Sequence, residues 1–152
     1  MPEIIRPAAA GDIEGISLVE RESFSDPWGD SLFYDAVNDR NFHNFVSTED
    51  GKVTGFIIST WILPDVEIQD IAVAKESRGR GIGKRLLQCL FKAAAEDGAE
   101  RILLEVRKSN TPALSLYKKA GFTEDGIRPH YYEDPVEDAI LMSAYLNRKE
   151  DQ

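Results

Sequence analysis

A glycine-rich, basic turn is the segment of this sequence whose residue types point most directly to a ligand. It reads Glu76-Ser77-Arg78-Gly79-Arg80-Gly81-Ile82-Gly83-Lys84-Arg85. Glycines at alternate positions let a backbone approach a ligand closely, and free N–H groups at a helix start together with cations favour an anion. Because a strand precedes the turn and a long amphipathic helix follows, we expect a phosphate-bearing ligand rather than a merely flexible, basic helix entry.

The spacing within this turn excludes two common phosphate-binding loops. A nucleotide-triphosphate loop needs a glycine at position 78 and a serine or threonine after its lysine, but Arg78 and Arg85 stand there. The dinucleotide-binding fingerprint needs its third glycine at position 84, which is Lys84, and a strand that opens a doubly wound unit rather than one that follows a hairpin. Neither class of nucleotide site therefore fits.

Two residues farther along the chain have side chains that suit proton transfer. Glu105 interrupts the apolar run 102–106, where a carboxylate is costly unless it is paired, solvated or used. It is therefore either the ion-pair partner of Arg107 or Lys108 or a catalytic base. Tyr117 lies on the next amphipathic helix, where it is either a core aromatic residue or, with an ordinary pKa of about 10, a proton donor.

Residues that could form a covalent nucleophile or a metal site do not cluster. Cys89 lies among leucines with no adjacent histidine, so we expect it to pack inertly in its helix. His43 and His130 are too few and too far apart in sequence to indicate a metal centre, and no metal is predicted. Tyr131 and Tyr132 are expected in a loop, where they either plug the core or line a peptide channel.

Hydrophobic periodicity and turn residues predict the elements that must position these side chains. In the first half of the chain we expect a strand at Ile4 and Ile5, helices over 12–24 and 31–38, a hairpin of strands 42–48 and 52–62 around Asp50-Gly51, and a strand over 66–73. In the second half we expect a helix over 81–97, a strand over 101–106, and a helix capped by Thr111 and stopped by Gly121. A strand over 122–127, an irregular stretch through Pro135 and a strand over 139–146 are expected to follow. This order predicts an α/β fold with a mixed sheet, partly antiparallel and partly parallel, flanked by helices.

Length and composition predict one globular domain over residues 1–152. A chain of 152 residues can bury about two thirds of the surface that its unfolded form exposes. Its single cysteine cannot form an intrachain disulfide, and it carries neither a basic leader followed by an apolar run nor a segment apolar enough to span a membrane, so the cytoplasm is expected. A net charge of -9 disfavours nucleic-acid binding and suits a cationic substrate better.

The arrangement Arg78-x-x-Gly81-x-Gly83 resembles the pyrophosphate-binding turn of the GCN5-related N-acetyltransferase superfamily, and the order of elements extends the resemblance over nearly the whole chain. Residues 68–73, 104–110 and 113–122 are most similar to the ribosomal-protein alanine N-acetyltransferases. The resemblance implies direct transfer of an acetyl group from acetyl-coenzyme A, in a ternary complex, to the N-terminal alanine of a small-subunit ribosomal protein. Residues 134–139 depart from the Gly-Arg pair that relatives typically carry before their Glu-Asp-Ala step.

The resemblance also implies a role for each candidate residue. Glu105 would act as general base through a water, and Tyr117 as general acid for the departing coenzyme A. The cofactor is expected to contact Ile71, Ala72, Val73, Arg78, Gly79, Arg80, Gly81, Ile82, Gly83, Lys84, Asn110 and Tyr117. The acceptor peptide is expected to contact Trp28, Tyr131 and Tyr132.

Two alternatives to this function stay open. The acceptor could be a lysine side chain, a polyamine or another small amine, or the chain could be a non-catalytic module that binds coenzyme A or a protein. An α-amino group has a pKa of about 8, against about 10.4 for lysine, so a carboxylate acting through water is a sufficient base for an N-terminus. The acidic composition favours a basic peptide behind that N-terminus. The presence of both Glu105 and Tyr117 argues against the non-catalytic module.

Overall fold

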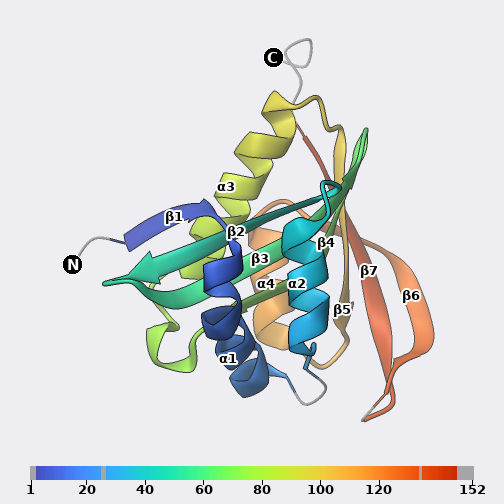
Figure 1. The fold of residues 1–152 in the computed structure, drawn as a ribbon. Coiled ribbons are helices and arrows are strands. Elements are labelled where there is room, and N and C mark those ends of the chain that lie inside the picture. Colours follow the sequence, from blue (N-terminus) through green and yellow to red (C-terminus); the bar gives the residue numbers. More distant parts are fainter. Residues whose placement is uncertain (1–2, 25–26, 134, 147–152) are drawn as a thin grey trace.

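Seven strands of the computed structural model pair into one sheet in the order β1-β2-β3-β4-β5-β7-β6 (Figure 1). The structure describes residues 3–24, 27–133 and 135–146, and every statement of structure refers to them. The strands are β1 (Glu3–Pro7), β2 (Phe42–Glu49), β3 (Lys52–Ile62), β4 (Asp65–Val73), β5 (Arg101–Arg107), β6 (Thr123–Tyr132) and β7 (Glu137–Tyr145). Only β4 and β5 run parallel among these neighbours, which confirms the predicted mixed sheet.

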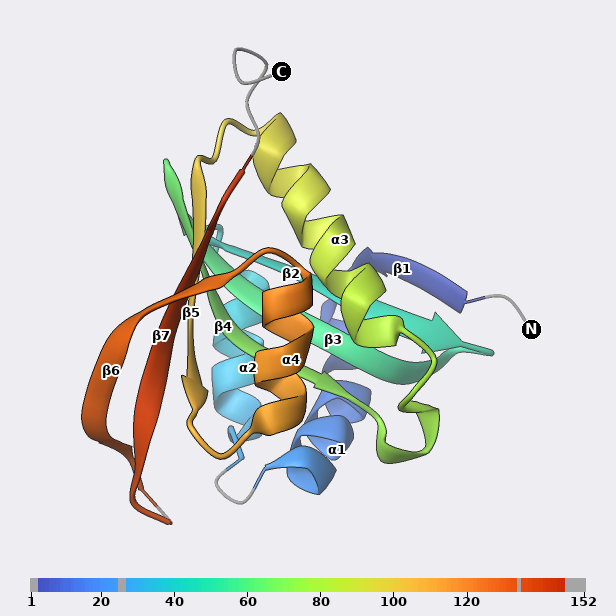
Figure 2. The ribbon, with the colours of Figure 1, turned by 180° about the vertical axis from the view of Figure 1, so that it is seen from behind.

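Helices cover both faces of the sheet. The front face in Figure 1 carries α1 (Ile13–Ser23) and α2 (Asp30–Asn38), and the reverse view of Figure 2 shows α3 (Ile82–Glu96) and α4 (Thr111–Lys119) on the other face. Two short 3-10 turns, η1 (Ala10–Asp12) and η2 (Lys75–Ser77), precede α1 and α3. No helix in the described part of the chain combines the length and the apolarity needed to cross a membrane.

Each face of the sheet has its own hydrophobic cluster, and β3 contributes to both. Ile57 points into the cluster under α3, whereas Phe56 and Ile58 point into the cluster under α1 and α2. The inward side of α3 repeats at spacings of three and four through Ile82, Leu86, Leu87, Leu90 and Ala94. Because side chains alternate along a strand, a central strand covered on both faces must be apolar at nearly every position.

Two details of the predicted elements were wrong. The N-cap of α4 is Asn110, whose Oδ1 accepts a hydrogen bond from the Ala113 amide at 3.2 Å, and Thr111 is the first helical residue. The chain after residue 127 is not an irregular loop, because β6 extends to Tyr132 and pairs with β7, with register shifts on the way. Tyr131 and Tyr132 therefore belong to a strand at the edge of the sheet, where exposed residues hide the alternation that identifies a strand.

The sheet opens in its middle, between β4 and β5. These two strands pair over three residue pairs, from Asp65 with Arg101 to Glu67 with Leu103. Beyond them β4 continues to Val73 against β3, and β5 continues to Arg107 against β7 (Figure 2). The facing edges of β4 and β5 past Glu67 therefore carry backbone groups that do not bond to each other, and these groups need other partners.

Candidate active site

The glycine-rich turn lies at the start of α3, directly after the open end of β4. Gly79 and Gly81 have φ angles of 82° and 79°, in the left-handed region that favours glycine, and Gly81 is the N-cap of α3. The first turn of α3 contains no acidic residue, so its free N–H groups keep the attraction for an anion that a helix N-terminus provides. The backbone here is shaped for an anionic group.

The arginines of this turn are engaged by the protein itself. Arg78 donates from Nε to the Val73 carbonyl and from Nη2 to the Ser23 hydroxyl, each at 3.1 Å, and so ties the turn to β4 and α1. Arg80 lies 3.4 Å from a carboxylate oxygen of Glu49. In this structure the side chain of Arg78 shapes the turn, and the contact with a cofactor that the resemblance implies for it stays a prediction.

The residues expected to line the cofactor lie around the open end of β4. Ile71 and Val73 pack toward α3 and α4, whereas Ala72 is buried on the α1 side. A Cβ at Gly83 would lie 3.3 Å from Leu116 and 3.8 Å from Val73, so α3 begins in close contact with α4 and β4. Asn110 caps α4 near the open end of β5, and its cofactor contact likewise stays a prediction.

Gly55 is a residue that the sequence interpretation missed. A Cβ at Gly55 would lie 3.2 Å from the Ala72 carbonyl oxygen, 3.0 Å from Ile82 and 3.2 Å from Leu86. Its missing side chain lets the start of α3 settle against β3 and β4. A glycine inside an otherwise β-branched strand is a signal for such a close approach, and the sequence carried that signal.

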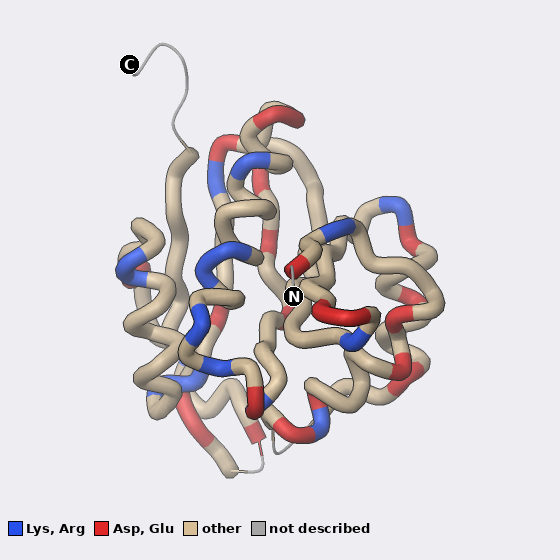
Figure 3. Tube along the Cα trace, turned by 90° about the vertical axis from the view of Figure 1, so that its left-hand side faces the viewer, with Lys and Arg blue, Asp and Glu red and all other residues tan. Residues whose placement is uncertain are grey.

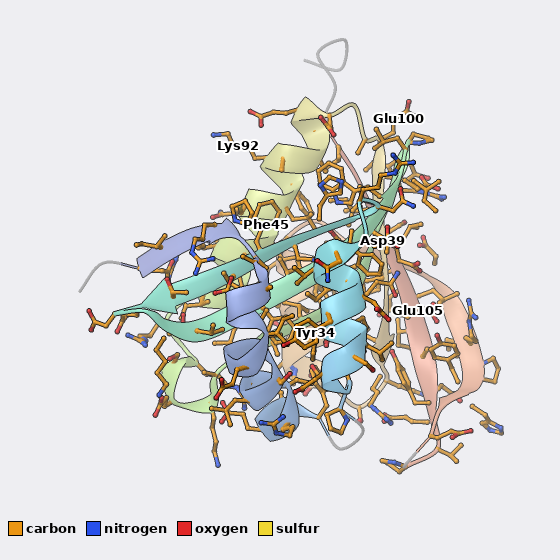
Figure 4. All side chains as sticks on the ribbon, viewed as in Figure 1. Tyr34, Asp39, Phe45, Lys92, Glu100 and Glu105 are labelled. Atoms are coloured by element: carbon orange, nitrogen blue, oxygen red, sulfur yellow. The ribbon has the colours of Figure 1, made fainter. Side chains whose placement is uncertain are left out.

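Glu105 lies in β5 on the face opposite α3 and α4, because its neighbours Leu104 and Val106 face the α3 cluster (Figure 4). Its ion-pair partner is Arg128 of β6, whose Nε lies 3.4 Å from Oε2 without forming a hydrogen bond. Arg107 pairs instead with Glu137 at 3.4 Å, so the suggested pairing of Glu105 with Arg107 is wrong. Burial raises the pKa of Glu105, Arg128 lowers it and Glu67 raises it, with burial the largest effect.

Tyr117 is almost completely buried, with 5% of its surface exposed. Its ring packs edge-on against Phe122, with centroids 5.6 Å apart. Burial, followed by the charges of Asp70 and Tyr132, raises the pKa of Tyr117 far above its usual value. The phenol is therefore both a core aromatic group and a group that keeps its proton at any physiological pH. The same shift makes it a weaker acid than the sequence alone suggested.

Tyr132 brings the end of β6 into the surroundings of both Glu105 and Tyr117. Burial and the charge of Glu105 are the largest effects that raise the pKa of Tyr132 to about 12. The guanidinium of Arg107 lies 4.5 Å from the Tyr132 ring centre, and that of Arg128 lies 4.9 Å from the ring centre of Tyr131. The two tyrosine rings are 5.1 Å apart. Arginines and rings thus form one wall beside Glu105.

Trp28 lies on the segment between α1 and α2. Its ring stacks on Phe33 at 5.2 Å, and its backbone N–H donates to Glu20 Oε2 at 2.9 Å. Glu20 is 1% exposed, and its other oxygen, Oε1, has no hydrogen-bond partner. Asp70 of β4 faces Glu20 and also has an unpartnered buried oxygen, Oδ2. Sequence reasoning missed this pair of acids because the two residues lie far apart in the chain.

The helices on the two faces of the sheet differ in charge (Figure 3). α1 and α2 carry Glu14, Glu20, Glu22, Asp30 and Asp35 against a single cation, Arg21. α3 and α4 carry Lys84, Arg85, Lys92, Lys118 and Lys119 against a single acid, Glu96. Among the described residues, no group of three or more His, Cys, Asp or Glu side chains is placed to hold a metal ion.

Comparison with known proteins identifies the family to which this architecture belongs. Residues 13–122 match the acetyltransferase (GNAT) family. A protein of Bacillus subtilis (strain 168) named as a putative ribosomal protein bS18-alanine N-acetyltransferase is 35% identical over 144 residues, which cover 94% of this chain and 95% of that protein. The ribosomal protein bS18-alanine N-acetyltransferase of Escherichia coli (strain K12) is 34% identical over 134 residues, which cover 87% of this chain and 90% of that protein.

A solved structure agrees with these sequence relatives. The crystal structure of the ribosomal-protein-S18-alanine N-acetyltransferase from Escherichia coli has a TM-score of 0.90 and 30% identity to this chain. The match covers 97% of this chain and 96% of the other. The open sheet, the glycine turn at α3 and the carboxylate in β5 thus occur in a chain that belongs to the acetyltransferase (GNAT) family.

Proposed function

We propose that this protein transfers the acetyl group of acetyl-coenzyme A to the α-amino group of a protein, directly and in a ternary complex. The observation that carries the proposal is the opening between β4 and β5 beside the glycine turn of α3, with Glu105 on one strand of the opening. The family match supports the acetyl transfer, and the names of the two relatives support an amino-terminal acceptor.

The fit of acetyl-coenzyme A rests on the backbone of this chain. The N–H groups at the start of α3, after the left-handed Gly81, suit the diphosphate of the carrier. The free edge of β4 at 71–73 suits the amides of the pantetheine arm, and N–H groups there could polarise the carbonyl of the acetyl group. When bound, this cosubstrate supplies the acetyl group as a thioester. Lys84 and Arg80 add positive charge beside the same turn.

Glu105 and Tyr117 supply the two proton transfers that the reaction needs. Burial raises the pKa of Glu105, which makes it a stronger base than an exposed glutamate, while the charge of Arg128 works against complete neutralisation. Glu105 takes a proton from the attacking amine through a water. Tyr117, which keeps its proton because burial raises its pKa, gives that proton to the departing thiolate.

The acceptor we propose is the N-terminal alanine of a small-subunit ribosomal protein. This choice rests on the relatives, whose names specify the alanine of ribosomal protein bS18. The acidic helices α1 and α2 suit a basic peptide behind the amino terminus. Trp28, Tyr131 and Tyr132 are proposed to contact that peptide. We place the reaction in the cytoplasm, with ribosomal proteins, and treat 1–152 as one catalytic domain because a single sheet joins β1 to β7.

Locating the transferred acetyl group by mass spectrometry tests the proposal. The protein is incubated with acetyl-coenzyme A and, in separate reactions, with an Ala-initiated ribosomal peptide, the same peptide with a blocked N-terminus, a lysine peptide and a polyamine. We expect acetylation of the free α-amino group. Preferred transfer to lysine or polyamine would replace the acceptor, and no transfer to any amine would favour a binding module.

The catalytic roles have their own test in the same assay. Glu105→Gln and Tyr117→Phe are each expected to lower kcat by about a hundredfold to ten-thousandfold, the range for general acid–base groups. Tyr145→Phe, on an exposed tyrosine of β7, is the matched control and should retain the wild-type rate. Undiminished turnover in both Glu105→Gln and Tyr117→Phe would remove these residues from the mechanism.

A further inference from the structure

Glu20 and Asp70 form a pair of facing carboxyl groups in the interior, between α1 and β4. Glu20 is 1% exposed, and Asp70 is partly exposed as a residue but has its Oδ2 enclosed. Each carboxyl group has one buried oxygen without a hydrogen-bond partner, Oε1 of Glu20 and Oδ2 of Asp70. Buried polar atoms in native proteins nearly always have partners, so two facing orphans require an explanation.

No lysine or arginine in the described ranges forms an ion pair with either carboxyl group. The neighbouring positions are apolar: Ile58 is opposite Asp70 in β3, Ala72 follows on the same face of β4, and Phe33 of α2 is fully buried in the same cluster. The charge of Asp70 in turn raises the pKa of Tyr117 on α4. Two negative charges cannot be held together in such surroundings without a compensating positive charge or a proton.

We propose that Glu20 and Asp70 share a single proton, and that this proton fixes the backbone of Trp28 against β4 at the edge of the opening. One proton between the two carboxyl groups gives a partner to both orphaned oxygens. The second oxygen of Glu20 already accepts from the Trp28 amide at 2.9 Å, so the connection runs from β4 through the pair to the backbone of Trp28.

The electrostatics of the region agree with this geometry. Burial and the neighbouring Glu20 raise the pKa of Asp70 well above its usual range, so Asp70 is the member that carries the proton. While Asp70 keeps this proton, the pair holds one negative charge rather than two. When the pH rises through the raised pKa of Asp70, the proton leaves, the carboxyl groups repel each other, and the link between β4 and the backbone of Trp28 is broken.

Glu20 and Asp70 are in this view positioning residues for the acceptor side, which rests on the proposed role of Trp28 in peptide binding. The expected consequence is a KM for the acceptor peptide that rises about twofold to tenfold at alkaline pH, as loss of one hydrogen bond would give. The KM for acetyl-coenzyme A should change less than the KM for the peptide over the same range, because neither carboxyl group belongs to the glycine turn at the start of α3.

Infrared and NMR spectroscopy test the shared proton without any acetyl transfer. The wild-type protein should show the C=O stretch of a protonated, buried carboxyl group at neutral pH, and both Asp70→Asn and Glu20→Gln should lack it. The Trp28 amide resonance should shift at the pH where this band disappears. Asp70→Asn should abolish that shift, because an amide donates to Glu20 at every pH. Asp70→Ala has no donor to offer and should leave the Trp28 amide poorly protected throughout.

Asp12→Asn is the matched control, since Asp12 is a buried carboxylate whose partner is Arg6, at 2.8 Å, rather than another acid. It should destabilise the protein yet leave the infrared band and the Trp28 shift unchanged. A wild-type spectrum without the band, or a Trp28 shift that persists in Asp70→Asn, would overturn the proposal. Failure of the proposed function would give a different result, because the infrared band and the Trp28 shift would be observed although no amine was acetylated.

Discussion

The two faces of the sheet present opposite charge and opposite kinds of contact to the opening between β4 and β5. On the α3 and α4 face, the contacts are backbone groups of one continuous segment, 71–83, with cations around it. On the α1 and α2 face, acids and aromatic rings from several elements surround Glu105 and Trp28. The difference suits the two molecules that the proposed reaction brings together, an anionic carrier and a cationic amine.

The largest change in activity is expected from replacing Glu105, the carboxylate on the α1 and α2 face. Glu105→Gln removes the base but keeps the size of the side chain, so kcat should fall about a hundredfold to ten-thousandfold. The Kd for acetyl-coenzyme A, measured by calorimetry, should change little because the proposed site of the carrier lies on the other face. A variant that loses carrier affinity together with kcat would show that the two faces are not separable.

The next largest effect is expected from filling the close contact at Gly55, beside the start of α3. Gly55→Ala places a methyl group 3.2 Å from the Ala72 carbonyl oxygen and 3.0 Å from Ile82, so α3 must move outward. The free energy of unfolding should fall by about 1–3 kcal/mol, as overpacking does, and the KM for acetyl-coenzyme A should rise. Thermal unfolding and initial rates measure both. Gly126→Ala, where a Cβ meets nothing within 4 Å, should change neither quantity.

The pH dependence of kcat/KM tests the effect of Arg128 on Glu105. Glu105 must be ionised to act as a base, so kcat/KM should fall as pH drops through its pKa, which burial raises. Arg128 lowers that pKa, and Arg128→Gln should therefore move the acid limb of the profile to higher pH and slow the reaction a few-fold near neutrality. Arg101 lies on β5, like Glu105, but pairs with Asp65 of β4 at 3.1 Å, and Arg101→Gln should leave the pH profile unchanged.

The smallest effects should come from the exposed charges of the helices. Asp35→Lys on α2 is expected to raise the KM for a basic acceptor peptide about twofold at low salt, with the KM for acetyl-coenzyme A unchanged. Lys92→Glu on α3 should leave the KM for the peptide unchanged. Salt should erase the Asp35→Lys effect, because exposed charges are screened. Equal responses of both substrates to either substitution would contradict a division of charge between the faces.

Local patterns were sufficient to predict the glycine turn at the start of α3 and the order of elements. The glycine turn, the periodic apolar residues of α3 and the Asp50-Gly51 hairpin each lie within a short stretch of sequence, and the mixed sheet follows from their order. Asn110 and Thr111 are both good capping residues, and the sequence interpretation chose Thr111 whereas the N-cap is Asn110. The end of β6 was missed because its residues are exposed on an edge strand.

The acceptor side could not be predicted in the same way because its partners lie far apart in sequence. Glu105 finds Arg128 on β6 rather than Arg107 on its own strand, and Glu20 meets Asp70 across the α1–β4 interface. Such pairings depend on how the elements pack, which no local spacing encodes. The residue type of Glu105 and its position in an apolar strand identified it as unusual. The residues around it could be identified only from the folded structure.

The short parallel pairing of β4 and β5 affects how the specificity of such a protein can evolve. Past Glu67, the carrier is expected to meet main chain, which every residue type supplies, so many substitutions there should preserve recognition of the acyl donor. The opposite lining consists of side chains, each of which a single mutation can replace. An ancestor with this architecture could therefore exchange one amine for another through stepwise replacement while its donor stayed the same.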